Sequence, residues 1–266
     1  MRIVRYVNFD GVSCWGRWVD AAHAVPMEGE LLGEHHFTGE PQRIDRRLPP
    51  VDPPNIIAIG RNYSEHAREM KAESIPDEPL IFLKATTSVI GPNDAIVLPR
   101  SAPDEVDFEA ELAVIIAATA KDVCEERALE YVFGYTCAND VSARDCQKRR
   151  DRQWARGKSF DTFCPLGPVL VTKDEGPPDG REIRSILNGH VMQDGNTSDM
   201  IFSVPFLVSY LSRQFTLRPG TVILTGTPSG VGAARSPQVF LRAGDEIAVE
   251  IDGIGRLSNP VKRFSP

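Results

Sequence analysis

The stretch that decides the fold is DFEAELAVIIA, residues 107–117. Its second half is an unbroken apolar run, which is typical of a strand buried on both faces. Its first half carries Glu109 and Glu111, which share one face because side chains alternate along a strand. Buried neighbouring carboxylates repel each other unless a cation or a proton lies between them. A solvated polar face is the alternative, but the apolar continuation indicates a buried strand.

Asp140 adds a third carboxylate and opens the segment 141–150, which we expect to be a helix. Arg144 and Gln147 follow at i+4 and i+7, so all three side chains would share one helix face. Hard divalent cations prefer oxygen ligands, so the three carboxylates predict a metal site. The alternatives are a helix cap for Asp140 and an ordinary surface ion pair with Arg144.

Lys158 lies in GKSF after the strongly basic run KRRDRQWAR, residues 148–156. This run is either an exposed loop or a local positive field that attracts a small anionic substrate. Lys158 taken alone is most often an ordinary solvated lysine.

A second candidate cluster lies in GRNYSEHARE, residues 60–69, which contains Arg61 and Tyr63. His66 and Glu69 are spaced i, i+3, so the carboxylate could orient the imidazole to take a proton from water. An ordinary exposed pair on a helix is the alternative.

The glycine-rich segment GTPSGVG, residues 226–232, follows an apolar strand. It lacks the lysine of a phosphate-binding loop, so a nucleotide site is not predicted. Backbone amides and the Thr227 hydroxyl could instead bind a substrate carboxylate.

The chain divides at the proline-rich segment 49–54, so we predict a small β-rich module at residues 1–50 and a catalytic domain at 51–266. Short predicted strands outnumber helices, which indicates an α+β, mostly β fold. The predicted strands are 2–9, 13–19, 55–60, 80–84, 107–117, 131–139, 169–172, 182–188, 221–225, 245–251 and 255–257. The predicted helices are 62–71, 125–130, 141–150 and 203–214, the last capped by Ser203.

Composition excludes several classes of protein. A net charge of −7 disfavours binding to nucleic acid or to an anionic membrane. The sequence has no apolar run long enough to span a bilayer, and its polar N-terminus does not resemble a signal peptide, so we expect a cytoplasmic protein. Five cysteines without a Cys-x-x-Cys pair argue against disulfides or structural zinc.

Taken together, the motifs resemble the fumarylacetoacetate hydrolase family. The segments GRNYxxHxxE, DFExEL, NDVSARDxQ, GKSFD and LTGTPSGVG occur in this order, from about residue 54 to the C-terminus. The match is closest to the branch that contains acylpyruvases, oxaloacetate decarboxylases and 2-hydroxyhepta-2,4-diene-1,7-dioate isomerases.

This resemblance implies a mixed β-sandwich roll, a homodimer, and a Mg²⁺ or Mn²⁺ ion, for which Ca²⁺ can substitute in crystals. It implies metal ligands at Glu109, Glu111 and Asp140, and catalytic roles for His66, Glu69 and Lys158. It also implies substrate contacts from Arg61, Tyr63, Arg144, Gln147 and Thr227.

The implied substrate is a small anionic 2-oxo acid. We expect hydrolysis of a carbon–carbon bond in an acylpyruvate or fumarylpyruvate, as in aromatic catabolism, through a metal-stabilised pyruvate enolate. Oxaloacetate decarboxylation and dienoate isomerisation would use the same site and stay open. A catalytically silent dicarboxylate-binding protein and a two-metal nuclease are weaker alternatives.

Overall fold

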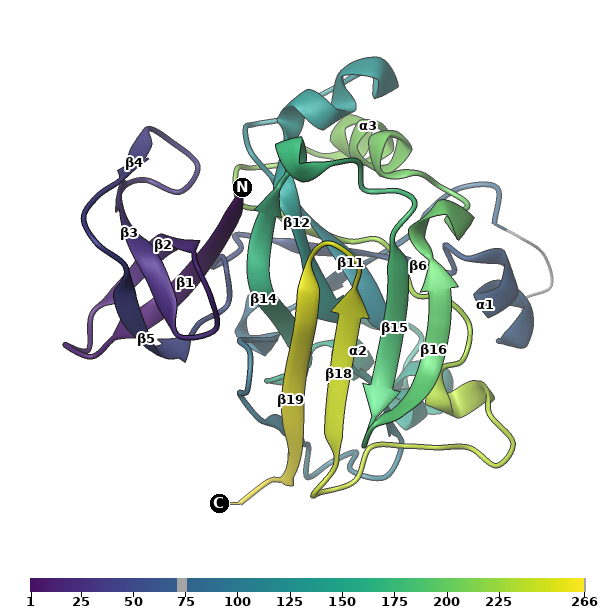
Figure 1. Cartoon of the computed structure of the whole chain (residues 1–266). Helices are drawn as coiled ribbons and strands as arrows, with labels where there is room; N and C mark the ends of the chain where they lie inside the picture. Colours follow the sequence, from purple (N-terminus) through teal and green to yellow (C-terminus); the bar gives the residue numbers. More distant parts are fainter. Residues whose placement is uncertain (71–75, 266) are drawn as a thin grey trace.

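The computed structural model describes residues 1–70 and 76–265, and two packed sheets form its body (Figure 1). The larger sheet runs in the order β2-β3-β5-β1-β14-β12-β11-β17-β6-β7, with β4 beside β3 and β8 beside β14. Its strands are β1 (Arg2–Asn8), β2 (Ser13–Trp18), β3 (His23–Gly29), β4 (His35–Phe37), β5 (Gln42–Arg47), β6 (Ile56–Gly60), β7 (Leu80–Lys84), β8 (Val89–Ile90), β11 (Ala110–Ile116), β12 (Val132–Asn139), β14 (Cys164–Thr172) and β17 (Val222–Leu224).

The second sheet has the order β16-β15-β18-β19-β9, and a separate two-stranded pair joins β10 to β13. These strands are β9 (Ile96–Leu98), β10 (Val106–Asp107), β13 (Ser142–Ala143), β15 (Glu182–Leu187), β16 (His190–Asn196), β18 (Glu246–Ile251) and β19 (Gly255–Arg263). Strands β18 and β19 form the predicted C-terminal hairpin. The mostly β, mixed α+β architecture predicted from the sequence is confirmed.

Helices are few and short. The α-helices are α1 (Ser64–Glu69), α2 (Ala155–Lys158) and α3 (Val204–Gln214). Single turns of 3₁₀ helix lie at Thr86–Ser88, Lys173–Glu175, Thr197–Asp199 and Gly232–Ala234. A longer 3₁₀ helix of seven residues spans Glu125–Tyr131, and a π-helical turn lies at Cys146–Arg150.

Strand β11 lies deep in the core, as its apolar run predicts. Its side chains alternate between two clusters, with Leu112 and Val114 in one and Ala113 and Ile115 in the other. The first cluster includes residues of α3, β18 and β19, and the second is formed within and around the larger sheet. Because both faces are covered, a charged side chain at the start of β11 is also removed from water.

The N-terminal strands β1 to β5 lie to one side of the body in Figure 1. They join the larger sheet through β1 and β14, where Ile3 pairs with Leu170. Ile3 is fully buried at this junction. The proposed boundary near residue 50 stays a prediction, because the sheet is continuous across it.

One predicted element is wrong. Residues 141–150 do not form a helix entered through Asp140: the chain first makes β13, where Ala143 pairs with Val106, and only then the π-helical turn. Val141 and Ala143 are both buried with Phe163 in one apolar cluster, and this burial favours extended backbone over helix. The predicted helix 62–71 is also shorter at its start, beginning at Ser64, and its last residue lies outside the described residues.

Candidate active site

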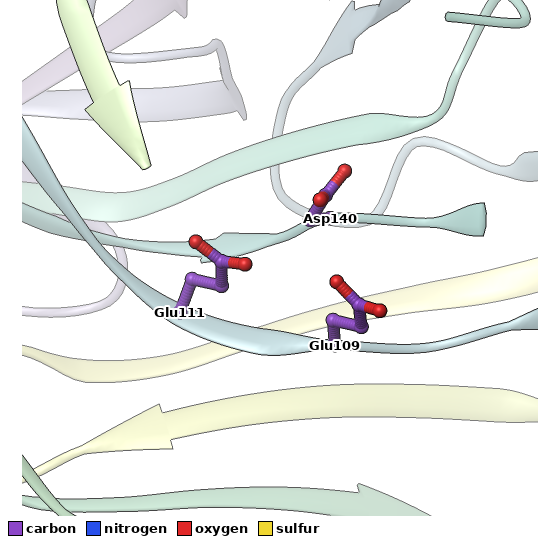
Figure 2. Close-up of side chains that lie close together, drawn as sticks. All are labelled: Glu109, Glu111 and Asp140. Atoms are coloured by element: carbon purple, nitrogen blue, oxygen red, sulfur yellow. The ribbon is translucent and has the colours of Figure 1, made fainter. Parts of the chain in front are cut away.

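Three buried carboxylates converge from two neighbouring strands (Figure 2). Glu109 immediately precedes β11, Glu111 lies within it, and Asp140 follows β12. Each offers an oxygen within 4.8 Å of the others, and none is more than 5% exposed. The backbone amide of Asp140 donates to the carbonyl of Glu109 at 2.9 Å, which ties the two strands together at this point. The predicted carboxylate cluster is therefore present.

Two lysine ammonium groups lie among these carboxylates. Lys158 Nζ contacts Glu109 Oε2 at 2.7 Å and Asp140 Oδ2 at 2.6 Å. Lys84 Nζ contacts Asp140 Oδ1 at 2.6 Å and also donates to the backbone carbonyl of Lys158. No sequence motif pointed to Lys84, whose only signal is its position at the end of the apolar strand LIFLK. Both lysines are buried, so these contacts fix the positions of Asp140 and Lys158.

Arg144 is also buried, but its partners differ from those predicted. Its Nε donates to Asp107 Oδ2 at 2.8 Å, its Nη2 lies 2.7 Å from Glu109 Oε1, and its Nη1 donates to Gln147 Oε1 at 2.8 Å. The predicted helix face common to Asp140, Arg144 and Gln147 does not form, because helical backbone begins only at Arg144 and Asp140 lies outside it. Asp107 also accepts hydrogen bonds from the backbone amides of residues 232 and 233. Asp107 is therefore held in place by the backbone and in turn holds the Arg144 guanidinium.

The charge balance of this cluster suits a divalent cation. Four buried carboxylates face three buried cations, namely Asp107, Glu109, Glu111 and Asp140 against Lys84, Arg144 and Lys158. Burial and the negative charges of Asp140 and Glu109 raise the pKa of Glu111 well above its usual value. Burial opposes ionisation of Glu109 too, but Lys158 and Arg144 hold its pKa below its usual range. An oxygen-only donor set with excess negative charge fits Mg²⁺ or Mn²⁺.

His66 and Glu69 form the predicted dyad on α1. His66 Nδ1 lies 2.8 Å from Glu69 Oε1, and His66 is only 5% exposed. The other oxygen of Glu69 accepts a bond from the amide of Gly230 at 2.9 Å. The glycine-rich loop therefore orients Glu69, which in turn orients the imidazole. This arrangement leaves Nε2 as the ring nitrogen for proton transfer.

A cavity of about 340 Å³ is lined both by His66 of the dyad and by two of the carboxylates, Glu109 and Glu111. It is lined by Ile59, Gly60, Arg61, His66, Met70, Phe82, Glu109, Glu111, Arg144, Gln147, Lys148, Trp154, Lys158 and Thr227. Its size suits a small substrate rather than a polymer.

Two predicted substrate contacts differ from expectation. Tyr63 lines a separate cavity with Asp194 and Asp199, and does not line the one that holds the carboxylates. The Thr227 hydroxyl reaches the main cavity, but it donates to the Ala110 carbonyl at 2.8 Å and accepts from Gln193 at 2.6 Å. Thr227 therefore supports the cavity wall more directly than it offers a free hydroxyl.

The basic run 148–156 is largely neutralised by neighbouring acids. Arg149 pairs with Glu105 at 2.8 Å, and Arg156 pairs with Asp151 at 2.6 Å. Arg150 also pairs with an acid, Asp145, at 3.1 Å. The exposed-loop interpretation fits these three arginines.

Comparison with known proteins resolves the family. The family model "Fumarylacetoacetate (FAA) hydrolase C-terminal" matches residues 55–262. The chain belongs to the fumarylacetoacetate hydrolase family. The family resemblance inferred from the motifs is thereby confirmed, and the chain is an enzyme of this family.

Its relatives carry several activities in their names. The chain is 50% identical over 215 residues to a mitochondrial oxaloacetate tautomerase, fahd2, of Xenopus laevis, covering 80% of this chain and 67% of the relative. A solved 5-carboxymethyl-2-hydroxymuconate delta-isomerase of Mycobacterium smegmatis is 42% identical, with a TM-score of 0.87 over 99% of this chain and all of that one. A fumarylacetoacetate hydrolase of Exiguobacterium antarcticum is 39% identical, with a TM-score of 0.88 over 99% and 100%.

Two further expectations can be compared with the structure. All five cysteines lie among the described residues and are free, in agreement with the absence of a disulfide framework. Across residues 1–70 and 76–265, every helix is too short or too polar to cross a membrane.

Proposed function

We propose that this enzyme converts a 2-oxo dicarboxylic acid of the oxaloacetate type between its keto and enol forms. The observation that carries the proposal is the imidazole of His66, held by Glu69 and lining the same cavity as Glu109 and Glu111. A single oriented base beside an acidic metal site is sufficient for enolisation. The tautomerase name of the frog relative supports this choice of reaction.

The residues that would hold the ion are Glu109, Glu111 and Asp140. A Mg²⁺ or Mn²⁺ ion bound there would act as a Lewis acid toward the 2-oxo group. Lys158 adds a positive charge in the same buried volume, which stabilises an oxyanion as it develops. His66 removes a proton from the carbon next to the 2-oxo group, and Glu69 stabilises the imidazolium that forms. The imidazolium then returns the proton to the oxyanion, directly or through water, which gives the enol and restores the neutral imidazole.

Hydrolysis of an acylpyruvate, which the sequence predicts, is the second candidate. The same dyad could activate a water molecule for attack on a distal carbonyl, and a solved relative is named a fumarylacetoacetate hydrolase. Decarboxylation and dienoate isomerisation use the same enolate chemistry and differ in the bond that changes. All of these reactions would use the same site, so the substrate that the enzyme turns over fastest distinguishes them.

Turnover of oxaloacetate and acetylpyruvate, run in parallel with Mg²⁺ and then with excess chelator, tests these assignments. We expect chelator-sensitive ketonisation of enol-oxaloacetate and slower release of pyruvate from acetylpyruvate. Pyruvate release from acetylpyruvate as the faster reaction would assign the enzyme to hydrolysis. Rapid pyruvate formation from oxaloacetate would instead assign it to decarboxylation.

Assembly and location are proposals that rest on the family. We infer a homodimer with a small anionic 2-oxo acid as its substrate. The sequence leads us to expect a cytoplasmic location, whereas the name of the frog relative describes that protein as mitochondrial. Sedimentation and imaging of the tagged chain would decide these two points.

A further inference from the structure

Lys148 differs from the other basic residues of its run. Within residues 148–156 it is the basic residue that lines the cavity holding Glu109 and Glu111. Arg149 and Arg150, which follow it, are paired with acids. Lys148 has no ion-pair partner among the described residues, although burial and repulsion from Arg144 lower its pKa. Its ammonium group is thus available to an anion that enters the cavity.

Arg61 is a second available cation in the same cavity. Its guanidinium lies over the Trp154 ring, with Cζ 5.8 Å from the ring centroid. Trp154 packs closely against Gly60, where an added Cβ would lie 2.6 Å from the indole ring. The ring also meets Phe82 edge-on, with centroids 5.5 Å apart. A fixed aromatic wall therefore holds Arg61 near the cavity.

The remaining cations of the cavity are already committed. Arg144 is engaged by Asp107 and Glu109, and Lys158 by Glu109 and Asp140. These groups complete the carboxylate cluster and leave no unpaired charge for a distant substrate group. The cavity therefore has a metal-binding side and a separate pair of free cations.

We propose that Lys148, together with Arg61, binds the second carboxylate of the substrate and makes this enzyme selective for 2-oxo dicarboxylates over 2-oxo acids with an uncharged distal end. The proposal rests on the proposed function, because it assumes that the 2-oxo acid end faces Glu109, Glu111 and Asp140. It deepens that function by naming the residues that would select a dicarboxylate substrate.

The test uses N-oxalylglycine, a stable dicarboxylate, and its glycine methyl ester, which keeps the oxalyl end and lacks the second charge. Binding of each to the full-length protein is measured by calorimetry with Mg²⁺ present. We expect the wild-type protein to bind the diacid more tightly than the ester. Lys148→Gln should weaken diacid binding roughly fivefold, as for a partly exposed ion pair. It should leave ester binding unchanged, and Lys148→Arg should restore diacid binding.

Arg149→Gln is the matched control, since this neighbour has the same kind of exposed charge but pairs with Glu105 outside the cavity lining. It should alter neither affinity. Equal binding of diacid and ester by the wild-type protein, or equal weakening of both by Lys148→Gln, would overturn the proposal. Selective diacid binding without turnover of oxaloacetate would support this inference and reject the proposed reaction, so the two failures are distinguishable.

Discussion

Glu111 is the buried carboxylate of the cluster whose negative charge is least compensated by neighbouring cations. It has no ion-pair partner among the described residues, and it accepts one bond from the Gly226 amide at 2.7 Å. Glu109 and Asp140, by contrast, each contact Lys158. Burial raises the pKa of Glu111, and the negative charges of Asp140 and Glu109 raise it further. A divalent cation would relieve the repulsion that the lysines leave.

Glu111→Gln should therefore stabilise the metal-free protein and weaken its binding of metal. The pKa of this carboxyl group is higher in the folded protein than in the unfolded chain, where it is near 4.5. The free energy of unfolding therefore falls as the pH rises above about 4.5. We expect the metal-free variant to be more stable than the wild type at neutral pH, with the difference vanishing below that value. Thermal unfolding against pH measures this effect.

The same variant should bind Mg²⁺ at least ~10-fold more weakly, because it loses a charged ligand. Calorimetric titration with Mg²⁺ provides the measurement. Undiminished metal affinity would remove Glu111 from the ligand set.

Lys84 is a member of the buried charge cluster that no local sequence pattern indicates. A lone lysine in an apolar strand gives no pattern, and its role depends on Asp140 and Lys158, which lie 56 and 74 residues away along the chain. The carboxylates were predictable because their spacing and apolar surroundings are local. Contacts between distant segments are not encoded in any local pattern.

Lys84→Met should lower the free energy of unfolding by about 3 kcal/mol, because it leaves Asp140 buried with one cation fewer. Urea unfolding of the metal-free protein measures this loss. Lys121→Met is the control: its ion pair with Asp122 is exposed and long, at 3.6 Å, so the loss should stay below ~1 kcal/mol. Equal losses in the two variants would mean that the buried contact has no special weight.

At the scale of elements, helix α3 and strand β11 were predicted well, and segment 141–150 was not. Helix α3 has a clear apolar periodicity and a capping serine, which are local signals. Segment 141–150 has the helical spacing of Asp140, Arg144 and Gln147, but its fold is set by burial of Val141 and Ala143 against distant residues. Tertiary packing overrode a weak local preference there.

Ser203 supplies a direct test of the local signal in α3. Its side chain accepts a bond from the Phe206 amide at 3.3 Å at the first turn of the helix. Ser203→Ala should cost about 1 kcal/mol in unfolding free energy, and Ser203→Asp should restore it. A variant pair with identical stability would show that the cap contributes nothing.

At the scale of the whole molecule, the site exists because the larger sheet brings distant segments together. The carboxylates lie within β11 or next to the ends of β11 and β12, β7 supplies Lys84, and α1 places His66 in the wall of the same cavity. The sequence predicted the fold class and many of the residues that line the main cavity. Tyr63 and Arg61 are two residues apart, yet Arg61 lines the main cavity and Tyr63 lines another one. The sequence alone does not show which cavity each of these side chains faces.

The central claim is that His66 transfers a proton at a site that Glu109, Glu111 and Asp140 make metal-dependent. The most direct measurement is deuterium exchange at C3 of oxaloacetate in D₂O, followed by NMR for the wild-type protein and His66→Asn, with Mg²⁺ and with excess chelator. We predict rapid exchange only for the wild-type protein with Mg²⁺, at least ~100-fold faster than for the variant, the scale expected for a general base. Exchange that is equally fast in His66→Asn, or unaffected by chelator, would contradict the account.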